Sequence, residues 1–159
     1  DCGLGVDDYQ QLVGAFAGDQ AAAWWRAGYD RAEVESYLLI DFWRTTNMDE
    51  PLRHMPLALC DPNSVDPADI VPTEIHGIAP DGRAPHQMAL RRNPEQRWYF
   101  YPGMTGDEVL AFKLFEARKS DPEPRLRACF HSAFADPAAP ADAQPRQSCE
   151  CRVGVFVMR

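Results

Sequence analysis

The sequence predicts a mainly β domain of the sandwich or barrel kind, with helices at its N-terminal end. Three observations carry this prediction. Apolar residues recur at helical spacing only near the start, eight short apolar runs follow, and Pro, Gly, Asn and Asp clusters separate those runs. Fourteen Pro and ten Gly in 159 residues are typical of short strands joined by turns.

The helical segment, residues 1–29, contains two predicted helices. Asp7 or Asp8 is expected to cap the first, because a carboxylate can accept hydrogen bonds from the free N–H groups of a first turn. Gly18 breaks the pattern, and Asp19 is expected to cap a second helix rich in Ala and Trp. The apolar stripe of the first helix consists of Leu12, Val13, Phe16 and Ala17.

Residues 36–159 are predicted to form strands, without an internal repeat or a second domain. A Pro- and Ala-rich loop, residues 136–145, precedes the last strand. The eight predicted strands cover residues 36–43, 57–60, 70–75, 87–91, 97–101, 108–115, 127–130 and 149–158.

The charge balance argues against a nucleic-acid partner. Sixteen Lys and Arg against 24 Asp and Glu give a net charge of −8, whereas nucleic-acid binding requires clustered basic residues. The densest basic cluster, Arg91, Arg92 and Arg97, adjoins four aromatic residues at 98–101. We interpret this run as a buried strand with one solvent-exposed edge, rather than as a surface on which bases stack. No apolar run approaches the ~20 residues of a membrane span, so no membrane contact is expected either.

The cysteines indicate a protein with reduced thiols. Five is an odd number, and the spacings fit no disulfide framework, so we expect a cytoplasmic protein. Cys149 and Cys151 could form a metal pair, but residues i and i+2 of a strand share one face, where small apolar Cys suits a core. The five positions are Cys2, Cys60, Cys129, Cys149 and Cys151.

Several common enzyme classes lack their sequence signatures in this chain. HExxH, CxxC, Gly-rich phosphate loops and GxSxG are all absent, which removes support for metalloprotease, thioredoxin, nucleotide-binding and α/β-hydrolase functions. The chain contains only four His, so any imidazole chemistry must use one of them. His131, at the end of a predicted strand, is the candidate that the following residues support.

His131, Arg146 and Ser148 occur in an order that suits an iron oxygenase. Iron(II) that also binds a co-substrate and O₂ leaves room for about three protein ligands, typically two His and one carboxylate. The distal carboxylate of 2-oxoglutarate needs an Arg fork, and a hydroxyl two residues along the same strand face adds a hydrogen bond. The alternatives are a core or surface role for His131 and a solvated strand-edge position for Arg146.

Asp1 is the candidate carboxylate. Sites of this kind usually take one His and the carboxylate from an HxD pair on an early strand, and Asp1 precedes a Gly-containing turn and a helix. The matching His would then lie two residues before Asp1. The alternative is an ordinary Asp without a metal.

From Asp41 onward the chain resembles the AsaB-type hydroxylase/desaturase family, which includes gibberellin desaturase-like and cephamycin hydroxylase-like proteins. The similarity covers about three quarters of the chain. The matching stretches are Phe42-Trp43-Arg44, Met55 to Asp61, Ser64 to Pro67, Asn93-Pro94, Arg97 to Phe100, Gly103 to Thr105, Asp107 to Leu110, Phe112-Lys113, His131 to Phe134, Asp136-Pro137, Pro145 to Ser148 and Arg152.

The resemblance implies an Fe(II)/2-oxoglutarate-dependent oxygenase of secondary metabolism. Its core would be a double-stranded β-helix (jelly roll, cupin-like), and this chain would be the C-terminal part of the oxygenase domain, lacking the N-terminal part of the core. His131 and Asp1 would bind Fe(II), and Arg146 with Ser148 would bind the co-substrate 2-oxoglutarate, with Arg152 as a further candidate. The partners would be a small-molecule substrate and O₂.

Asp41 departs from the family pattern, and three other residues could line the cavity. Asp41 stands where the family usually has Asn, so an amide contact with the co-substrate is not carried over to this position. Lys113 lies in an otherwise apolar run, where it points either into the cavity or, as we favour, to the solvated face. Trp98 and Tyr99 could line the pocket, but aromatic residues of this kind are more often core.

Two other functions are compatible with the same residues. A jelly-roll module without catalytic activity could use the cavity to bind a small acidic or apolar ligand, because a fold does not fix a function. Exposed aromatic residues could instead bind another protein. The sequence leaves open the substrate, the choice between hydroxylation, desaturation and ring formation, the second His ligand and the oligomeric state.

Overall fold

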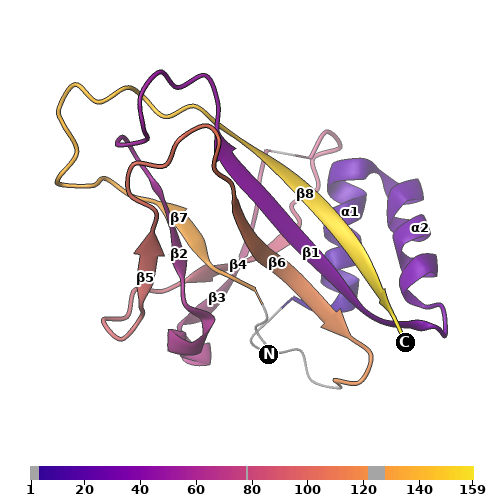
Figure 1. The fold of residues 1–159 in the computed structure, drawn as a ribbon. Helices are drawn as coiled ribbons and strands as arrows, with labels where there is room; N and C mark the ends of the chain where they lie inside the picture. Colours follow the sequence, from indigo (N-terminus) through magenta and orange to yellow (C-terminus); the bar gives the residue numbers. More distant parts are fainter. Residues whose placement is uncertain (1–3, 78, 122–127) are drawn as a thin grey trace.

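The computed structural model describes residues 4–77, 79–121 and 128–159, which form two helices followed by antiparallel strands (Figure 1). This confirms the predicted mainly β chain with N-terminal helices. Two short 3₁₀ turns, Pro62–Ser64 and Pro67–Asp69, precede β3. The helices and strands are α1 (Val6–Ala17), α2 (Asp19–Tyr29), β1 (Val34–Thr45), β2 (Leu57–Cys60), β3 (Ile70–Glu74), β4 (His86–Leu90), β5 (Trp98–Phe100), β6 (Leu110–Arg118), β7 (His131–Ala133) and β8 (Ser148–Met158).

Sheet A has the strand order β6-β1-β8, so β1 is its central strand. Both pairings are antiparallel, and in the middle of the sheet Asp41 lies opposite Phe112 of β6 and Arg152 of β8. The register with β6 shifts between Leu39 and Ile40. A shift of this kind inserts a residue into the ladder and increases the local twist.

Sheet B has the order β5-β2-β7 and packs against one end of sheet A. Leu57 and Leu59 of β2 face sheet A, and Ala58 between them faces away, because successive side chains of a strand alternate. Apolar residues of both sheets and their connections form the core between them: Trp43, Leu52, Leu57, Met104 and Phe112.

The helices cover the other end of the same face of sheet A. The Tyr9 ring stacks on Phe115 with centroids 4.4 Å apart, and Trp25 meets Tyr37 edge to face at 5.3 Å. The buried hydroxyls of Tyr9 and Tyr37 lie 3.0 Å apart and share a hydrogen bond. These aromatic contacts add specific geometry to the burial of a large apolar area.

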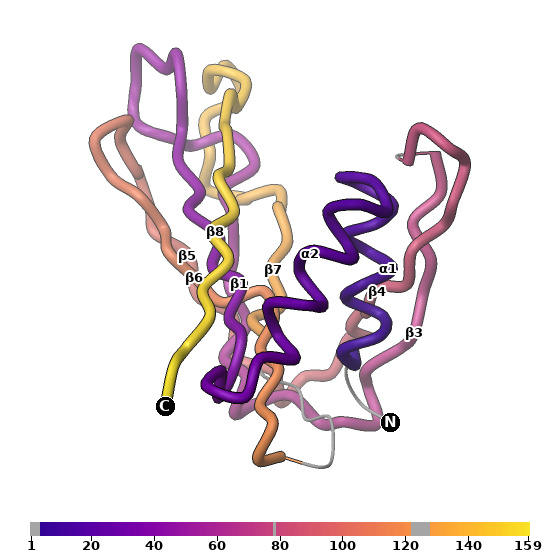
Figure 2. Tube along the Cα trace, turned by 90° about the vertical axis from the view of Figure 1, so that its right-hand side faces the viewer, coloured from indigo at the N-terminus to yellow at the C-terminus, as the bar shows by residue number. Residues whose placement is uncertain are grey.

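A separate hairpin, β3–β4, lies on the far side of the helix pair, as Figure 2 shows. Arg83 in its turn donates to the Gly14 carbonyl at 2.9 Å and to the Asp19 carboxylate at 2.8 Å. His86 Nδ1 lies 3.2 Å from the Asp8 carboxylate. The hairpin therefore contacts both ends of α1.

The helix boundaries match the prediction, but the N-cap positions differ. Gly5 is the N-cap residue of α1, and Asp8, in the first turn, accepts the Gly5 N–H at 2.9 Å. Asp19 is the first residue of α2 and makes no side-chain cap, because Gly18 with φ 87° occupies the N-cap position. Within the described residues, neither of these helices nor any other is long and apolar enough to cross a membrane.

The prediction of a strand at residues 127–130 is wrong for residues 128–130, the part of this range that the structure describes. The Cys129 N–H donates to Lys113 of sheet A, and the Phe130 carbonyl accepts from Cys60 of sheet B. The segment therefore crosses between two sheets and cannot form a continuous ladder with either. The strand begins at His131, which opens β7 instead of ending the preceding run.

The predicted burial of two strands is also wrong. Trp98, Tyr99 and Phe100 form an edge strand and are 39, 60 and 40% exposed. Cys149 and Cys151 are exposed, because the register of β8 turns Glu150 and its even-numbered neighbours to the inner face. The four cysteines of the described ranges carry free thiols.

We predict that Gly154→Ala destabilises the protein. A Cβ at this position would lie inside the van der Waals radius of the Tyr37 hydroxyl oxygen, so the buried Tyr37 would have to move. The expected loss is about 1–3 kcal/mol of unfolding free energy, measured by denaturant unfolding. Gly106→Ala is the matched control, because its Cβ would meet nothing nearer than 3.9 Å. Equal stability of the two variants would contradict the prediction.

Candidate functional site

Polar residues interrupt the apolar inner face of sheet A between the part that the helices cover and the part that sheet B covers. On β8, Ser148, Glu150 and Arg152 alternate with outward-facing residues and lie opposite buried residues of β1. Asp41 and Thr45 of β1 are fully buried, and buried polar side chains are uncommon unless they are paired or functional, so we take this junction as the candidate site. Its inner polar cluster consists of Asp41, His131, Glu150 and Arg152.

His131 has one ring nitrogen with a free lone pair. Its Nδ1 lies 3.1 Å from the Cys129 carbonyl oxygen, which can only accept, so Nδ1 is the donor and, in the neutral ring, Nε2 holds the lone pair. His131 pairs with Leu59, whose side chain faces sheet A, and its ring centroid lies 4.8 Å from that of Phe112. The imidazole is exposed at the inner edge of sheet B. Fixing the tautomer through Nδ1 is how proteins prepare a metal-binding imidazole.

Arg146 is held in place before β8 begins. Its Nη1 donates to the Met55 carbonyl at 2.8 Å, and its guanidinium carbon lies 5.8 Å from the centroid of the Trp43 ring. Met55 has a φ of 50°, a value that non-glycine residues rarely adopt. Arg146 is half-buried, and Ser148, two residues on, is exposed opposite the buried Thr45.

Asp41 is fully buried and has no donor for either carboxylate oxygen within the described residues. Burial raises the pKa of its carboxyl group above the ordinary 3.8, the nearby Glu150 carboxylate adds to the rise, and Arg152 and His131 oppose it. The rise in pKa favours the neutral form of this carboxyl group, which burial leaves without a hydrogen-bond partner among the described residues.

Arg152 lies opposite Asp41 and binds Glu150. Its Nη2 donates to Glu150 Oε1 at 2.5 Å, and both side chains are nearly half exposed. Other N–H groups of this guanidinium have no partner among the described residues, so they remain able to bind an anion. The pair is a charged edge beside the buried Asp41.

The predicted site residues are brought together to different degrees. His131 and Arg152 both act electrostatically on Asp41 and so share one neighbourhood. Arg146 is linked to them through Trp43, which packs with Phe112 in one core cluster. Asp1 lies outside the described residues.

Lys113 is on the outer face of sheet A, bound to the buried Glu116 carboxylate, as the favoured alternative predicted. The solvated face is therefore correct for Lys113, and the cavity position is not. Arg118 binds the same carboxylate from the other side. Both cations are thus used on the face opposite the candidate site.

Asp41 and Glu150 were not predicted as site residues. The signals were visible, because Asp41 is a lone acid in an apolar run and Glu150 lies between Ser148 and Arg152 at strand spacing. In the described ranges, no group of three metal-ligating side chains lies within binding distance of a common point. Of the metal candidates, the described residues thus contain His131 alone.

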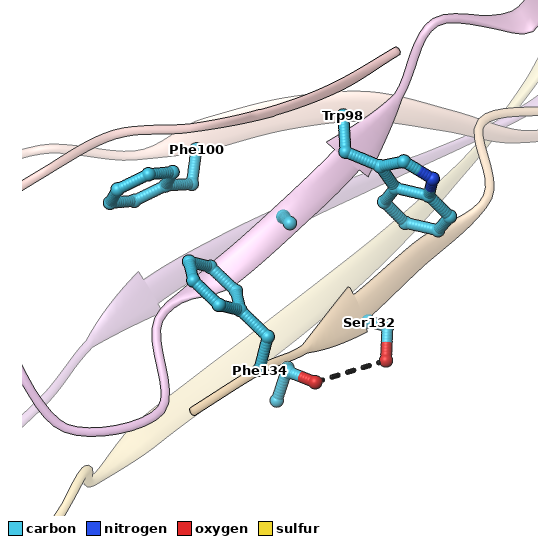
Figure 3. Close-up of a pocket in the computed structure, with 6 residues that line it drawn as sticks. Trp98, Phe100, Ser132 and Phe134 are labelled. Carbon is cyan, nitrogen blue, oxygen red and sulfur yellow. Dashed lines mark hydrogen bonds between the residues drawn. The ribbon is translucent and has the colours of Figure 1, made fainter. Parts of the chain in front are cut away.

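An apolar hollow of about 420 Å³ lies on the outer face of sheet B, as the close-up in Figure 3 shows. Trp98 and Phe100 line one side, and Ser132 and Phe134 line the other. It is separate from the inner polar cluster, because Ala58 at its floor faces away from sheet A. No titratable side chain lines it, so we do not assign the chemistry to it.

Comparisons with known proteins relate the chain to oxidative enzymes. The model of a family described as "Oxidoreductase/YMDC permease-like domain" matches residues 20–156. The hydroxylase/desaturase efuI of Hormonema carpetanum is 32% identical over 126 residues, which cover 74% of this chain and 40% of that protein. The Fe(II)/2-oxoglutarate-dependent dioxygenase nvfI of Aspergillus novofumigatus is 32% identical over 117 residues, covering 72% of this chain and 38% of that protein.

A solved structure is similar over almost all of the chain. The iron and alpha-ketoglutarate-dependent endoperoxidase NvfI superposes with a TM-score of 0.68 at 26% identity, over 99% of this chain and 53% of that one. The chain thus spans about half or less of the length of these relatives. The resemblance to the hydroxylase/desaturase family that the sequence predicted is confirmed.

We predict that Asp41→Asn stabilises the protein at neutral pH. Since the pKa of Asp41 is raised in the folded state, the unfolded state releases its proton first, and stability falls as pH rises from 3.8 through the folded value. Asn removes this dependence and keeps the shape. Thermal unfolding midpoints should therefore be higher for the variant at pH 7, with the difference shrinking toward pH 4. A constant difference across this range would contradict the prediction.

Proposed function

We propose that this chain, which belongs to the family described as oxidoreductase/YMDC permease-like domain, is part of an Fe(II)/2-oxoglutarate-dependent oxygenase. The enzyme would hydroxylate or desaturate a small organic metabolite of secondary metabolism. The observation that carries the proposal is His131, whose Nδ1 donates to the Cys129 carbonyl and whose ring lies beside Phe112 of sheet A, in the neighbourhood of Arg152. Relatives named as hydroxylase/desaturase and as Fe(II)/2-oxoglutarate-dependent dioxygenase support it.

The finer fold assignment is part of the proposal. Two antiparallel sheets with a common core are compatible with a double-stranded β-helix, or jelly roll. The partial coverage of the relatives is compatible with this chain being the C-terminal part of a single oxygenase domain. The similarity to the NvfI structure supports both.

His131 fits one position of an Fe(II) site. Its tautomer leaves Nε2 free for a metal, and its Nδ1–H to carbonyl bond holds the ring plane. Asp1 would supply the carboxylate, and the second His is not among the residues that we can name. When bound, Fe(II) with 2-oxoglutarate and O₂ supplies the oxidising power that removes hydrogen from the substrate.

Arg146 and Ser148 would bind 2-oxoglutarate, with Arg152 as a further candidate. Arg146 uses one Nη on Met55 and stacks near Trp43, so its guanidinium is oriented before the ligand arrives. The apolar Trp43 lowers the local dielectric constant and strengthens an ion pair with a carboxylate. Arg is suited to this role because its planar fork matches a carboxylate bidentately.

The alternative is a small-ligand-binding protein without catalytic activity. It would use the same inner face and would need no metal-bound imidazole. The two functions differ in whether His131 is required for turnover of 2-oxoglutarate, which the following measurement decides.

We predict that His131→Ala abolishes oxygenase activity in the whole protein. Loss of a metal ligand should reduce Fe(II)-dependent formation of succinate from 2-oxoglutarate by more than about 100-fold. His76→Ala is the matched control and should stay within about twofold, because His76 is exposed and contacts Glu74 on the hairpin. Succinate formation that survives in the His131 variant would overturn the metal role. Its absence from the unaltered protein would favour the binding alternative.

We predict that Arg146→Ala raises the KM for 2-oxoglutarate. Charge-assisted hydrogen bonds to a carboxylate are strong, so the expected rise is about 10- to 100-fold. Arg146→Lys should lie between the two, because Lys keeps the charge and loses the fork. Arg31→Ala serves as the control, since Arg31 is exposed and pairs with Glu33. An unchanged KM in Arg146→Ala would remove this residue from the co-substrate site.

A further inference from the structure

The two edges of sheet A differ in how they are protected against pairing with a further strand. β6 and β8 are the outer strands, on either side of β1 (Figure 1). An edge strand exposes backbone N–H and C=O groups, which proteins usually guard with charges, a bulge or a covering segment. The β6 edge has all three, because it carries the charged Lys113 and Arg118, its register with β1 shifts, and the Lys113 carbonyl accepts from the Cys129 N–H at 2.8 Å.

The opposite edge, on β8, lacks these protections. β8 (Ser148–Met158) pairs with β1 and with no other strand among the described residues. Its 11 residues are about twice the usual strand length, they include no Pro and no Lys, and the register with β1 shifts only at Val34. Two charges on its inner face, Glu150 and Arg152, bind each other. Residues 148–155 are all exposed, so this edge is open along most of its length.

The ladder with β1 shows which backbone groups of β8 are available. The Thr46 N–H donates to the Gln147 carbonyl at 3.0 Å, so these two residues form a hydrogen-bonded pair next to the strand. Opposite pairs of an antiparallel ladder alternate between bonded and non-bonded. The odd-numbered residues of 149–155 therefore bond to β1, and the N–H groups of the even-numbered residues point away from it. We call the latter the free-edge amides: those of Glu150, Arg152 and Gly154.

The side chains beside this edge indicate the kind of strand that fits it. On the outer face of sheet A, Val153 and Val155 are 41 and 36% exposed, so apolar side chains of a neighbouring strand would remove them from water. On the inner face, the ion pair of Glu150 and Arg152 suits polar neighbours. An extended segment with alternating apolar and polar side chains would match both faces and bond to the free-edge amides.

We propose that a β-strand from the part of the oxygenase outside this chain pairs with β8 and extends sheet A. This inference rests on the proposed function, which makes the chain one part of a single oxygenase domain. The solved NvfI structure matches 99% of this chain with 53% of its own, so nearly as much chain lies outside the matched part. A strand of the same polypeptide is present at high effective concentration, which favours it over a second copy of the protein.

The test is amide hydrogen exchange of the whole protein, resolved by residue. We expect the free-edge amides to exchange at least about 100-fold more slowly than in an unfolded chain, because a paired amide exchanges only when the strand opens. The amides of Cys151 and Val153 are the matched control, since they bond to β1 with or without a further strand. Slow exchange of the control amides together with unprotected free-edge amides would overturn the proposal.

A second copy is separated from the proposed strand by dilution with sizing. Protection that is lost as a dimer dissociates would assign the edge to a second copy and overturn the proposal, whereas protection in the monomer supports it. Failure of the proposed function is also distinguishable. A whole protein that forms no succinate but protects its free-edge amides would refute the oxygenase function and support the strand pairing.

A pair of variants provides an independent measurement. Glu150→Pro and Glu150→Ala both remove the ion pair with Arg152, but only Pro removes a free-edge N–H. We expect the amides of Arg152 and Gly154 to exchange at least about 10-fold faster in the Pro variant than in the Ala variant, because the added strand loses its bond at position 150. Equal exchange rates in the two variants would contradict the proposed pairing.

Discussion

The double pairing of strand β1 is the constraint on which the rest of the structure depends. β1 bonds along its length to β8 and over most of it to β6, so its side chains cannot change face without breaking both ladders. Tyr37, Leu39, Asp41 and Trp43 therefore share one face. The helices cover the first two, and sheet B covers the last. Asp41 lies between the part of this face that the helices cover and the part that sheet B covers.

This junction is where the fold places its polar inner groups. An aromatic core would be more stable with an apolar residue at position 41, because a buried carboxyl group loses its hydration. Asp41 instead lies there without a hydrogen-bond partner among the described residues, beside the ion pair of Glu150 and Arg152. Such exceptions to apolar burial concentrate at functional sites, where stability is reduced in exchange for a defined geometry.

The outer surfaces have a different character. Lys113 and Arg118 both bind Glu116 on the outer face of sheet A, and the hollow on sheet B is lined by Trp98, Phe100 and other uncharged residues. Neither brings together an unpaired cation and an imidazole. The chemistry proposed for this chain therefore belongs to the inner face.

The sequence by itself determined the two helices, the approximate position of seven strands and the candidates His131 and Arg146, since periodicity and turn residues are local signals. It also predicted that Cys149 and Cys151 share a face, because side chains alternate along a strand. Only the tertiary structure decided which face that is. Asp41 meets Arg152 across 111 residues of chain (152 − 41), through backbone bonds that no local pattern encodes. The same pairing turned Cys149 and Cys151 outward, and a second non-local pairing, of β7 with β2, set the start of β7 at His131.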